Sequence, residues 1–545
     1  MSEAALPTPV RHTQFDKWLI TLSVSFGTLM STVDSAIVNV ALSQIRSSIG
    51  ATVQEITWAS TSFIIATVLV LPLTGFFSRL FGQKRTYLAC LAIFVVSSFL
   101  CGIAWSLPSL VVFRALQGIG AGALVPTEQA ILRQTWSPEE QGMAMGIFSV
   151  VITVGPAIGP TLGGYIVDNF HWSWIFFINL PLGLIGFLLV WRFVHEPEDV
   201  LAANKAAAAI QRRNMDWAGI ALMWVGLATL QFVLEEGQRQ DWFESTEITV
   251  CTLVAGFCLA AFVLRELTAV APAVDLRLFA EPVFSSGAVL GAVMFFILIA
   301  NMFVLPLFMQ EMLGFTAMQA GMALMPRTLV MIVVMPIVGR LYNRISPRVL
   351  IGVGLFIIGL GVHRLMRVSL DTGRAEIIGS IMLQGLGTSL LFVPLNVVVF
   401  DKVARTRMAD AAGLNALMRQ IGSSVGLALF ATLMTRYTAE AQVGLSAHVI
   451  AERPELSERL ASSMSGLVAG GLEGFEATEA SLRLLAAAVQ RQASLLAFNR
   501  LFTLSVLLFV LALPLLGFLW LSPGNKPRKE APKEERNEVH MDVEV

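Results

Sequence analysis

Long apolar runs recur along the whole chain and constrain its fold more than any other feature. About fourteen of them approach the length of roughly 20 residues that an α-helix needs to cross a bilayer. Charged residues make up only 14% of the sequence, whereas soluble domains carry about 25%, and they cluster between the runs. The chain is therefore expected to be an all-α polytopic membrane protein. The runs cover residues 18–41, 56–77, 86–105, 110–132, 143–167, 174–194, 217–234, 248–267, 283–309, 318–341, 349–368, 377–400, 411–433 and 501–521.

Lys and Arg residues indicate which ends of the spans face the cytoplasm. They gather in the segments 11–17, 79–85, 340–348, 402–407 and 526–529. With fourteen crossings, all of these segments fall on one side, which the positive-inside rule assigns to the cytoplasm. Arg239, Arg367 and Arg374 are exceptions in the opposite loops. We therefore expect both termini to be cytoplasmic, and the first run is long enough to span rather than to act as a cleavable signal.

Several classes of chemistry find no support in the sequence. The four cysteines, Cys90, Cys101, Cys251 and Cys258, lie in apolar runs or at their edges, without a C-x-x-C pattern. We interpret them as packing residues and expect no metal site. A nucleotide-binding G-x-x-x-x-G-K-[ST] loop is absent from the sequence, which excludes ATP as the energy source. No enzymatic activity, cofactor or nucleic-acid partner is expected.

The chain repeats itself with an offset of roughly 265 residues, which is typical of duplicated membrane halves. The segment 75–84 after the second run resembles the segment 339–348. Gln117 to Pro126 is echoed by Gln384 to Pro394. This spacing predicts two six-helix halves with two inserted helices between them. The expected boundaries are 1–17 for a cytoplasmic N-terminus, 18–194 for the first half, 195–282 for a linker and the inserted helices, 283–521 for the second half, and 522–545 for a disordered cytoplasmic tail.

One segment of the second half, 437–492, is too polar to span a membrane. By the parity of the spans it forms an extracytoplasmic loop. Its apolar residues Leu456, Leu460, Met464 and Leu467 recur at helical spacing, so we expect an amphipathic helix within it.

Four segments carry a resemblance to a known family. The most specific is Gly155-Pro156-Ala-Ile-Gly159-Pro160-Thr-Leu-Gly163-Gly164 in the fifth run. The others run from Leu29 through Asp34 and Asn39, from Arg114 to Gly118, and from Trp172 through Asn179 to Gly183. Together and in this order they make the chain similar to the fourteen-span drug:proton antiporters of the major facilitator superfamily (EmrB/QacA-like), closest in pattern to EmrB. The resemblance extends from the first run to the last.

The resemblance implies a major facilitator fold in the bacterial inner membrane. It also implies multidrug efflux, the proton-driven export of small lipophilic compounds by alternating access, with antibiotic resistance as the outcome. EmrB-like exporters work with a periplasmic adaptor protein and an outer-membrane channel, which are the expected partners besides the lipid bilayer. One position departs from the wider superfamily. The loop after the second run usually has Asp four residues after its first Gly, and here that residue is Arg79. We therefore do not expect the usual Asp-centred charge relay among the loop residues Gly75, Arg79, Gly82 and Arg85.

Asp34, Arg114 and Glu128 are the candidate proton-coupling residues, because ionisable side chains inside a membrane are costly and usually functional. Burial disfavours an ionised carboxyl group and a nearby cation favours it, so Asp34 in such surroundings can bind and release a proton. Arg114 is expected to pair with Asp34. The alternatives are a structural carboxylate, a structural tie between helices and, for Glu128, a position near the cytoplasmic interface beside Arg133.

The remaining candidates concern the substrate and the gate. The glycines and prolines from Gly155 to Gly164 favour close helix contact and a bend. This segment is interpreted either as a hinge and seal or as tight packing alone. In the second half, Arg419 with nearby Asn415 and Gln420 is deep enough to face a cavity, whereas His363 and Arg364 are expected to reach the outer interface; Arg327 is a further cation within a span. The expected substrate-cavity residues are Asn39, Trp58, Gln117, Gln384, Asn396, Asn415 and Arg419.

Two other functions compete with multidrug export. The first is the export of one specific metabolite, siderophore or antibiotic by the same fold. The second is a membrane sensor or scaffold that transports nothing, against which Asp34 and Arg114 argue. Proton-coupled flux decides between transport and sensing.

Overall fold

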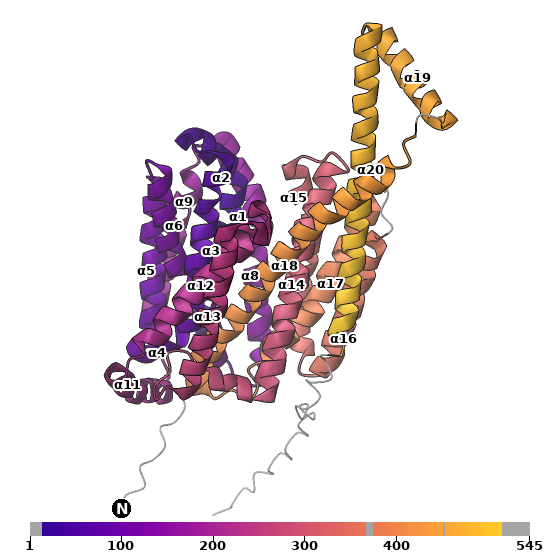
Figure 1. The fold of residues 1–545 in the computed structure, drawn as a ribbon. Helices are drawn as coiled ribbons and strands as arrows, with labels where there is room; N and C mark the ends of the chain where they lie inside the picture. Colours follow the sequence, from indigo (N-terminus) through magenta and orange to yellow (C-terminus); the bar gives the residue numbers. More distant parts are fainter. Residues whose placement is uncertain (1–12, 367–373, 451–452, 515–545) are drawn as a thin grey trace, which may run out of the picture.

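The computed structural model describes residues 13–366, 374–450 and 453–514, and every regular element in these segments is a helix (Figure 1). Fourteen helical stretches are long and apolar enough to cross a membrane. The predicted number of spans and the all-helical class are confirmed. Residues 1–12 and the predicted tail 522–545 lie outside the described residues.

The first six spans and the two that follow are formed by α1 (Gln14–Ile49), α3 with α4 (Trp58–Val70, Thr74–Phe81), α5 (Gln83–Gly102), α6 with α7 (Leu107–Gly122, Leu124–Thr135), α8 (Gln141–Asn169), α9 with α10 (Trp174–Phe177, Asn179–Phe193), α12 (Trp217–Glu236) and α13 (Thr246–Thr268). The last six are α14 (Pro282–Glu311), α15 (Ala317–Leu341), α16 (Pro347–Leu365), α17 (Arg374–Val398), α18 (Met408–Ser446) and α20 (Gly474–Ala512). The short α2 (Val53–Ile56) precedes α3 at the start of the second span, and the described residues also include α11 (Glu198–Arg213) and α19 (Pro454–Ala469), which do not span.

Local sequence explains where several of these helices begin, end or break. Thr13 and Asp16 form a capping box that starts α1, and Gly50 ends it in the left-handed conformation with φ 74°, which glycine adopts without steric cost. Pro72 lies in the short 3-10 turn η1 (Leu71–Leu73) that separates α3 from α4, because proline removes one helical hydrogen bond. The break at Pro72 is short, so α3 and α4 together still form one span that is long enough to cross the membrane.

The segment 437–492 differs in detail from a simple loop. α18 continues to Ser446, and α20 already begins at Gly474, well before the apolar run at 501–521. Alanine, glutamate, glutamine and arginine are strong helix formers, so the helices extend beyond their apolar parts. The predicted amphipathic helix is confirmed as α19, in which Leu456, Leu460 and Leu467 are half-buried. In Figure 1, α19 and the first part of α20 project beyond the rest of the bundle.

The two groups of six spans contact each other along α8 and α15, and a second set of contacts lies near one end of the bundle. We call this the basic end: α1 begins there, and Lys84, Arg85, Arg340 and Arg344 lie there. α8 lies along α15, and α4 with η1 packs against the start of α18. α12 contacts both α3 of the first group and α18 of the second (Figure 1). α1 makes no extensive contact with α14 to α18 over the described residues.

Candidate functional site

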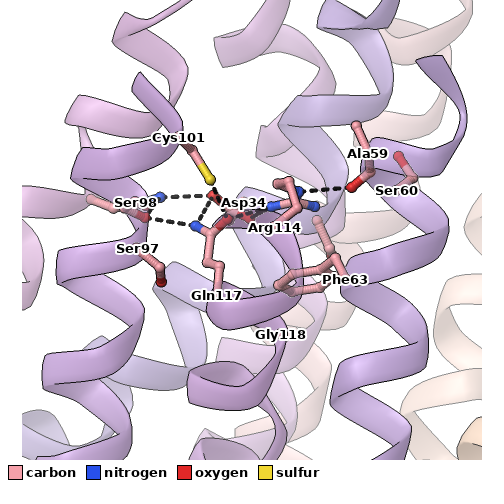
Figure 2. A network of polar contacts seen from close by, with 12 residues as sticks. Asp34, Ala59, Ser60, Phe63, Ser97, Ser98, Cys101, Arg114, Gln117 and Gly118 are labelled. Atoms are coloured by element: carbon pink, nitrogen blue, oxygen red, sulfur yellow. Dashed lines mark hydrogen bonds and ion pairs between the residues drawn. The ribbon is translucent and has the colours of Figure 1, made fainter. Parts of the chain in front are cut away.

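Asp34 lies in a closed polar network inside the first half (Figure 2). Its Oδ2 accepts a hydrogen bond from Arg114 Nη1 at 2.6 Å, which is also an ion pair. Its Oδ1 accepts from Gln117 Nε2 at 2.9 Å and from Asn179 Nδ2 at 2.8 Å. Each of these four residues is at most 1% exposed. The predicted pairing of Arg114 with Asp34 is confirmed, and three helices, α1, α6 and α10, supply the groups.

Arg114 has partners besides Asp34. Its Nε donates to the carbonyl oxygen of Ala59 at 3.0 Å, and its Nη1 donates to Gln117 Oε1 at 2.6 Å. The guanidinium also lies 4.2 Å from the ring centroid of Phe63, a cation–π contact. Because these interactions do not involve Asp34, Arg114 keeps hydrogen-bond partners when Asp34 is neutralised by a proton.

Asn179 and Ser98 complete the network and were not assigned a site role from the sequence. Ser98 Oγ accepts from Gln117 Nε2 at 2.6 Å and from Asn179 Nδ2 at 3.1 Å. Cys101 contacts Gln117 Oε1 through its Sγ at 3.7 Å. Both Asn179 and Ser98 are uncharged polar residues inside apolar runs, and this is the signal that the sequence offers for them. Asn179 also belonged to one of the four segments that carry the family resemblance.

Glu128 of α7 forms a separate site against helix α1. Ser25 donates to Glu128 Oε1 at 3.0 Å, while Oε2 is buried without a hydrogen-bond partner. Arg133 does not reach Glu128 and instead donates to Gln141 Oε1 at 2.9 Å and to the carbonyl oxygen of Val397 at 3.1 Å. Ser25 and Asp34 are separated by about 13 Å along α1. The buried carboxyl group of Asp34, on α1, and that of Glu128, which contacts α1, therefore lie at different depths along this helix.

The glycines of the α8 motif pack directly against α1 on either side of Asp34. Gly155 faces Thr32, and a Cβ atom at Gly159 would lie 2.5 Å from Ala36 Cβ. A Cβ atom at Gly163 would lie 3.3 Å from the carbonyl oxygen of Ile37, whereas Gly164 has open space around it. Residues four apart share one helix face, so three of the glycines form a smooth contact surface. Pro156 and Pro160 are half-buried on the same helix.

The predicted loop motif lies at the basic end and joins the two halves. Arg79 forms an ion pair with Asp410 at the start of α18. It also donates to Gln211 Oε1 of α11 at 2.9 Å and to the carbonyl oxygen of Ala273 at 3.1 Å. Gly75 lies so close to Asp410 that a Cβ atom would overlap its side chain. Arg79 therefore connects the first half, the second half and the segment between them.

The other two loop residues have different surroundings. Gly82 has φ 89°, and a Cβ atom there would lie 2.7 Å from Glu196 Oε1, so both conformation and space require glycine. Arg85 is exposed. Asp410 was missed from the sequence, although an acidic residue next to the basic segment 402–407 was its visible signal.

The expected substrate-cavity residues do not converge on one point. Gln117 belongs to the Asp34 network, and Asn396 joins the halves by accepting from Gln129 at 3.2 Å and donating to Ser149 at 3.3 Å. Two more lie on the first half: Asn39 is exposed and accepts from Ser60 at 3.1 Å, and Trp58 stacks on Phe232 of α12 at 5.8 Å. The three others lie in the second half: Gln384, Asn415 and Arg419.

The internal repeat does not duplicate the ion pair. Gln384 corresponds to Gln117, but Ile381 stands three residues before it, where the first half has Arg114. Gln384 Nε2 is buried without a hydrogen-bond partner. The buried acid–base pair is thus a property of the first half.

Comparison with known proteins gives a consistent family. The family described as Major Facilitator Superfamily matches residues 24–427. The chain is 34% identical to the Multidrug export protein EmrB of Haemophilus influenzae over 505 residues, covering 92% of this chain and 95% of that protein. It is 32% identical to the Fatty acid resistance protein FarB of Neisseria gonorrhoeae over 504 residues, with the same two coverages of 92% and 95%.

A solved structure supports the same fold. The proton:xylose symporter XylE superposes with a TM-score of 0.59 at 13% identity, covering 95% of this chain and 98% of that one. At this identity the likeness concerns the fold alone. Fourteen spans, a duplicated six-span arrangement and the relatives agree: the chain belongs to the major facilitator superfamily of membrane transporters.

Proposed function

We propose that this protein is a proton-coupled antiporter that exports small lipophilic compounds by alternating access. The observation that carries the proposal is the buried Asp34 carboxylate, held by Arg114, Gln117 and Asn179 at 2.6 to 2.9 Å. An intramembrane carboxylate with a cationic partner is suited to bind and release a proton. The names of the relatives, multidrug export and fatty acid resistance, point to lipophilic cargo.

In the proposed cycle, Asp34 is ionised when the transporter binds substrate and protonated when it returns empty. Protonation removes the negative partner of Arg114, which then relies on Ala59 and Gln117. This change alters the contacts between α1 and α6, and the glycines of α8 let α1 adjust its position. Glu128 of α7, which contacts Ser25 of α1, is proposed as a second proton site.

The energy available is sufficient for resistance. One proton that moves across one pH unit and 100 mV supplies about 3.7 kcal/mol, the sum of about 1.4 and about 2.3. For a neutral substrate exchanged one for one, this supports a concentration ratio of about 500.

The basic end is proposed to face the cytoplasm of a bacterial inner membrane, with both termini on that side. Support comes from the Lys and Arg residues of the short loops. The division at residues 194 and 283 into two halves and an inserted pair is part of this proposal.

The projecting part of α18, α19 and α20 is proposed to bind a periplasmic adaptor protein that leads to an outer-membrane channel. α20 is about 58 Å long at 1.5 Å per residue, roughly twice the thickness of the hydrocarbon core. Phe475 is 83% exposed and Val443 is 72% exposed in this part. Deleting residues 447–473 should abolish efflux across both membranes of cells but preserve transport in vesicles. Loss in both assays would count against adaptor binding.

Transport in proteoliposomes tests the proposed function. The purified protein is given a pH gradient, and a lipophilic cationic dye and a lipophilic weak acid are followed separately. Gradient-driven movement that Asp34→Asn abolishes is the expected result. Movement that survives Asp34→Asn would transfer the coupling role to Glu128, and no movement of either compound would favour a transporter for one specific metabolite.

A further inference from the structure

Arg419 in the second half carries a buried charge that has no ion-pair or hydrogen-bond partner among the described residues. It lies on α18, is 7% exposed, and its Nε and Nη2 atoms are buried without a hydrogen-bond acceptor. No acidic side chain forms an ion pair with it among the described residues. Its guanidinium carbon lies 5.3 Å from the ring centroid of Phe295 and 5.4 Å from that of Phe392. The cation is thus enclosed by two aromatic rings.

Asn415 lies one helical turn before Arg419 and likewise has no hydrogen-bond partner in the part of the chain that the structure describes. It is 1% exposed, and both its Nδ2 and its Oδ1 are buried without a hydrogen bond. Gly291 of α14 faces both residues: a Cβ atom there would lie 3.4 Å from Arg419 Nε and 3.8 Å from Asn415 Oδ1. A buried polar group normally has a partner, because leaving it without one costs free energy. Two such groups side by side indicate a site for a ligand.

The two free atoms of Arg419 define the chemistry of that ligand. Nε–H and Nη2–H point in parallel from one edge of the planar guanidinium, and such a pair binds both oxygens of a carboxylate. Asn415 Nδ2 is a third donor from the same helix face. Asp410, the nearest acidic residue before Arg419 in the chain, already pairs with Arg79.

We propose that Arg419 and Asn415 bind the carboxylate of a lipophilic organic acid, and that Phe295 and Phe392 contact its apolar part. This proposal rests on the proposed export function and names a class of substrate for it. The proton and the substrate then use different halves of the protein: Asp34 in the first and Arg419 in the second. Export of an anion in exchange for a proton also moves charge in the direction that an inside-negative membrane potential favours.

Binding of three decyl compounds tests the proposal without transport. Decanoate, decanol and decyltrimethylammonium have the same chain and differ in the charge of the head group. Equilibrium dialysis with radiolabelled compounds measures their affinity for the protein in phosphatidylcholine nanodiscs, and protein-free nanodiscs correct for partitioning into lipid. The wild type should bind decanoate more tightly than the other two.

Variants of Arg419 give the decisive comparison. Arg419→Gln should weaken decanoate binding by about tenfold or more, the loss expected for hydrogen bonds to a charged group, and leave decanol unchanged. Arg419→Lys keeps the charge but loses the paired donors, so its affinity for decanoate should lie between those of the wild type and Arg419→Gln. Arg327→Gln removes another buried arginine of the second half and should preserve decanoate binding. Equal decanoate affinity in wild type and Arg419→Gln, or an equal loss at Arg327→Gln, would overturn the proposal.

Two further arms separate the other possibilities. An acidic lipid carries the same negative charge, so phosphatidylglycerol is added to the nanodiscs in equimolar amount. If phosphatidylglycerol leaves the affinity for decanoate unchanged, the result supports a substrate site. If phosphatidylglycerol competes with decanoate in the wild type but not in Arg419→Gln, the site binds a lipid head group, and the proposal of a substrate site is overturned. Asp34→Asn should retain decanoate binding even though it loses proton-driven transport. A wild type that binds decanoate but does not transport it would therefore contradict the proposed function and not this site.

Discussion

Replacing Arg79 should open the basic end of the protein. In the described state Asp410 is 5% exposed and Arg79 15% exposed at the side chain. Arg79→Gln leaves the Asp410 carboxylate buried without its cation, and removing one partner of a buried ion pair costs about 3 to 5 kcal/mol. We take the lower bound, because Arg79 is partly exposed. About 3 kcal/mol changes the ratio of closed to open molecules by roughly a hundredfold.

Asp410→Asn should have a smaller effect than Arg79→Gln. Arg79 keeps its hydrogen bonds to Gln211 and to the carbonyl oxygen of Ala273 when Asp410 is neutral. The double charge reversal Arg79→Asp with Asp410→Arg restores the ion pair but not the carbonyl contact. We therefore expect it to recover part of the closed population relative to Arg79→Asp alone.

Hydrogen–deuterium exchange in nanodiscs measures this opening without labels. Peptides from α4 and from the first turns of α18 should exchange faster in Arg79→Gln than in the wild type, with a smaller increase in Asp410→Asn. In the double reversal the exchange rate should lie between those of the wild type and Arg79→Asp. Arg85→Gln is a matched control, since Arg85 is exposed in the same loop. Unchanged exchange in Arg79→Gln, or a double reversal no better than Arg79→Asp, would refute the role of this ion pair.

Three other outcomes follow from the packing and the polar network. Gly159→Val should lower thermal stability by about 1 to 3 kcal/mol through overpacking against α1, whereas Gly164→Ala should melt like the wild type; equal melting of both variants in a thermal-shift assay would contradict the packing. Gln117→Leu removes a hydrogen bond from both Asp34 and Arg114. The initial rate of pH-driven transport in proteoliposomes should therefore fall by about tenfold or more. A rate equal to that of the wild type would exclude the network from proton coupling. Glu128→Gln should melt like the wild type, because the amide oxygen still accepts from Ser25 and only an unpartnered oxygen is changed; a large loss of stability would indicate an ion pair for Glu128.

The sequence was sufficient to predict the fold because membrane-spanning helices consist of long apolar runs. It was also sufficient to pair Arg114 with Asp34, since a charge inside the membrane requires a counter-charge and few are available. It did not reveal Asn179 or Ser98 as partners, because an uncharged polar residue is common in such helices and its partner depends on how the helices rotate. The extent of α18 and α20 was missed for a different reason: hydropathy locates the membrane portion of a helix but not its ends.

The contact between Arg79 and Asp410 shows a second limit of sequence reasoning. The basic residue in place of the usual Asp indicated a departure from the family pattern, but its partner lies more than 300 positions away in the chain. Only the three-dimensional arrangement brings α4 to the start of α18. In the same way, the unpartnered state of Arg419 depends on what surrounds it, which a single sequence cannot specify.

Substrate-driven proton movement tests the central claim most directly. Proteoliposomes containing a pH-sensitive dye are loaded with a transported compound, and the compound is diluted outside without an imposed pH gradient. We predict that its efflux drives protons in the opposite direction in the wild type and that Asp34→Asn abolishes this proton movement. Substrate efflux with no proton movement in the wild type, or undiminished proton movement in Asp34→Asn, would contradict proton antiport through Asp34.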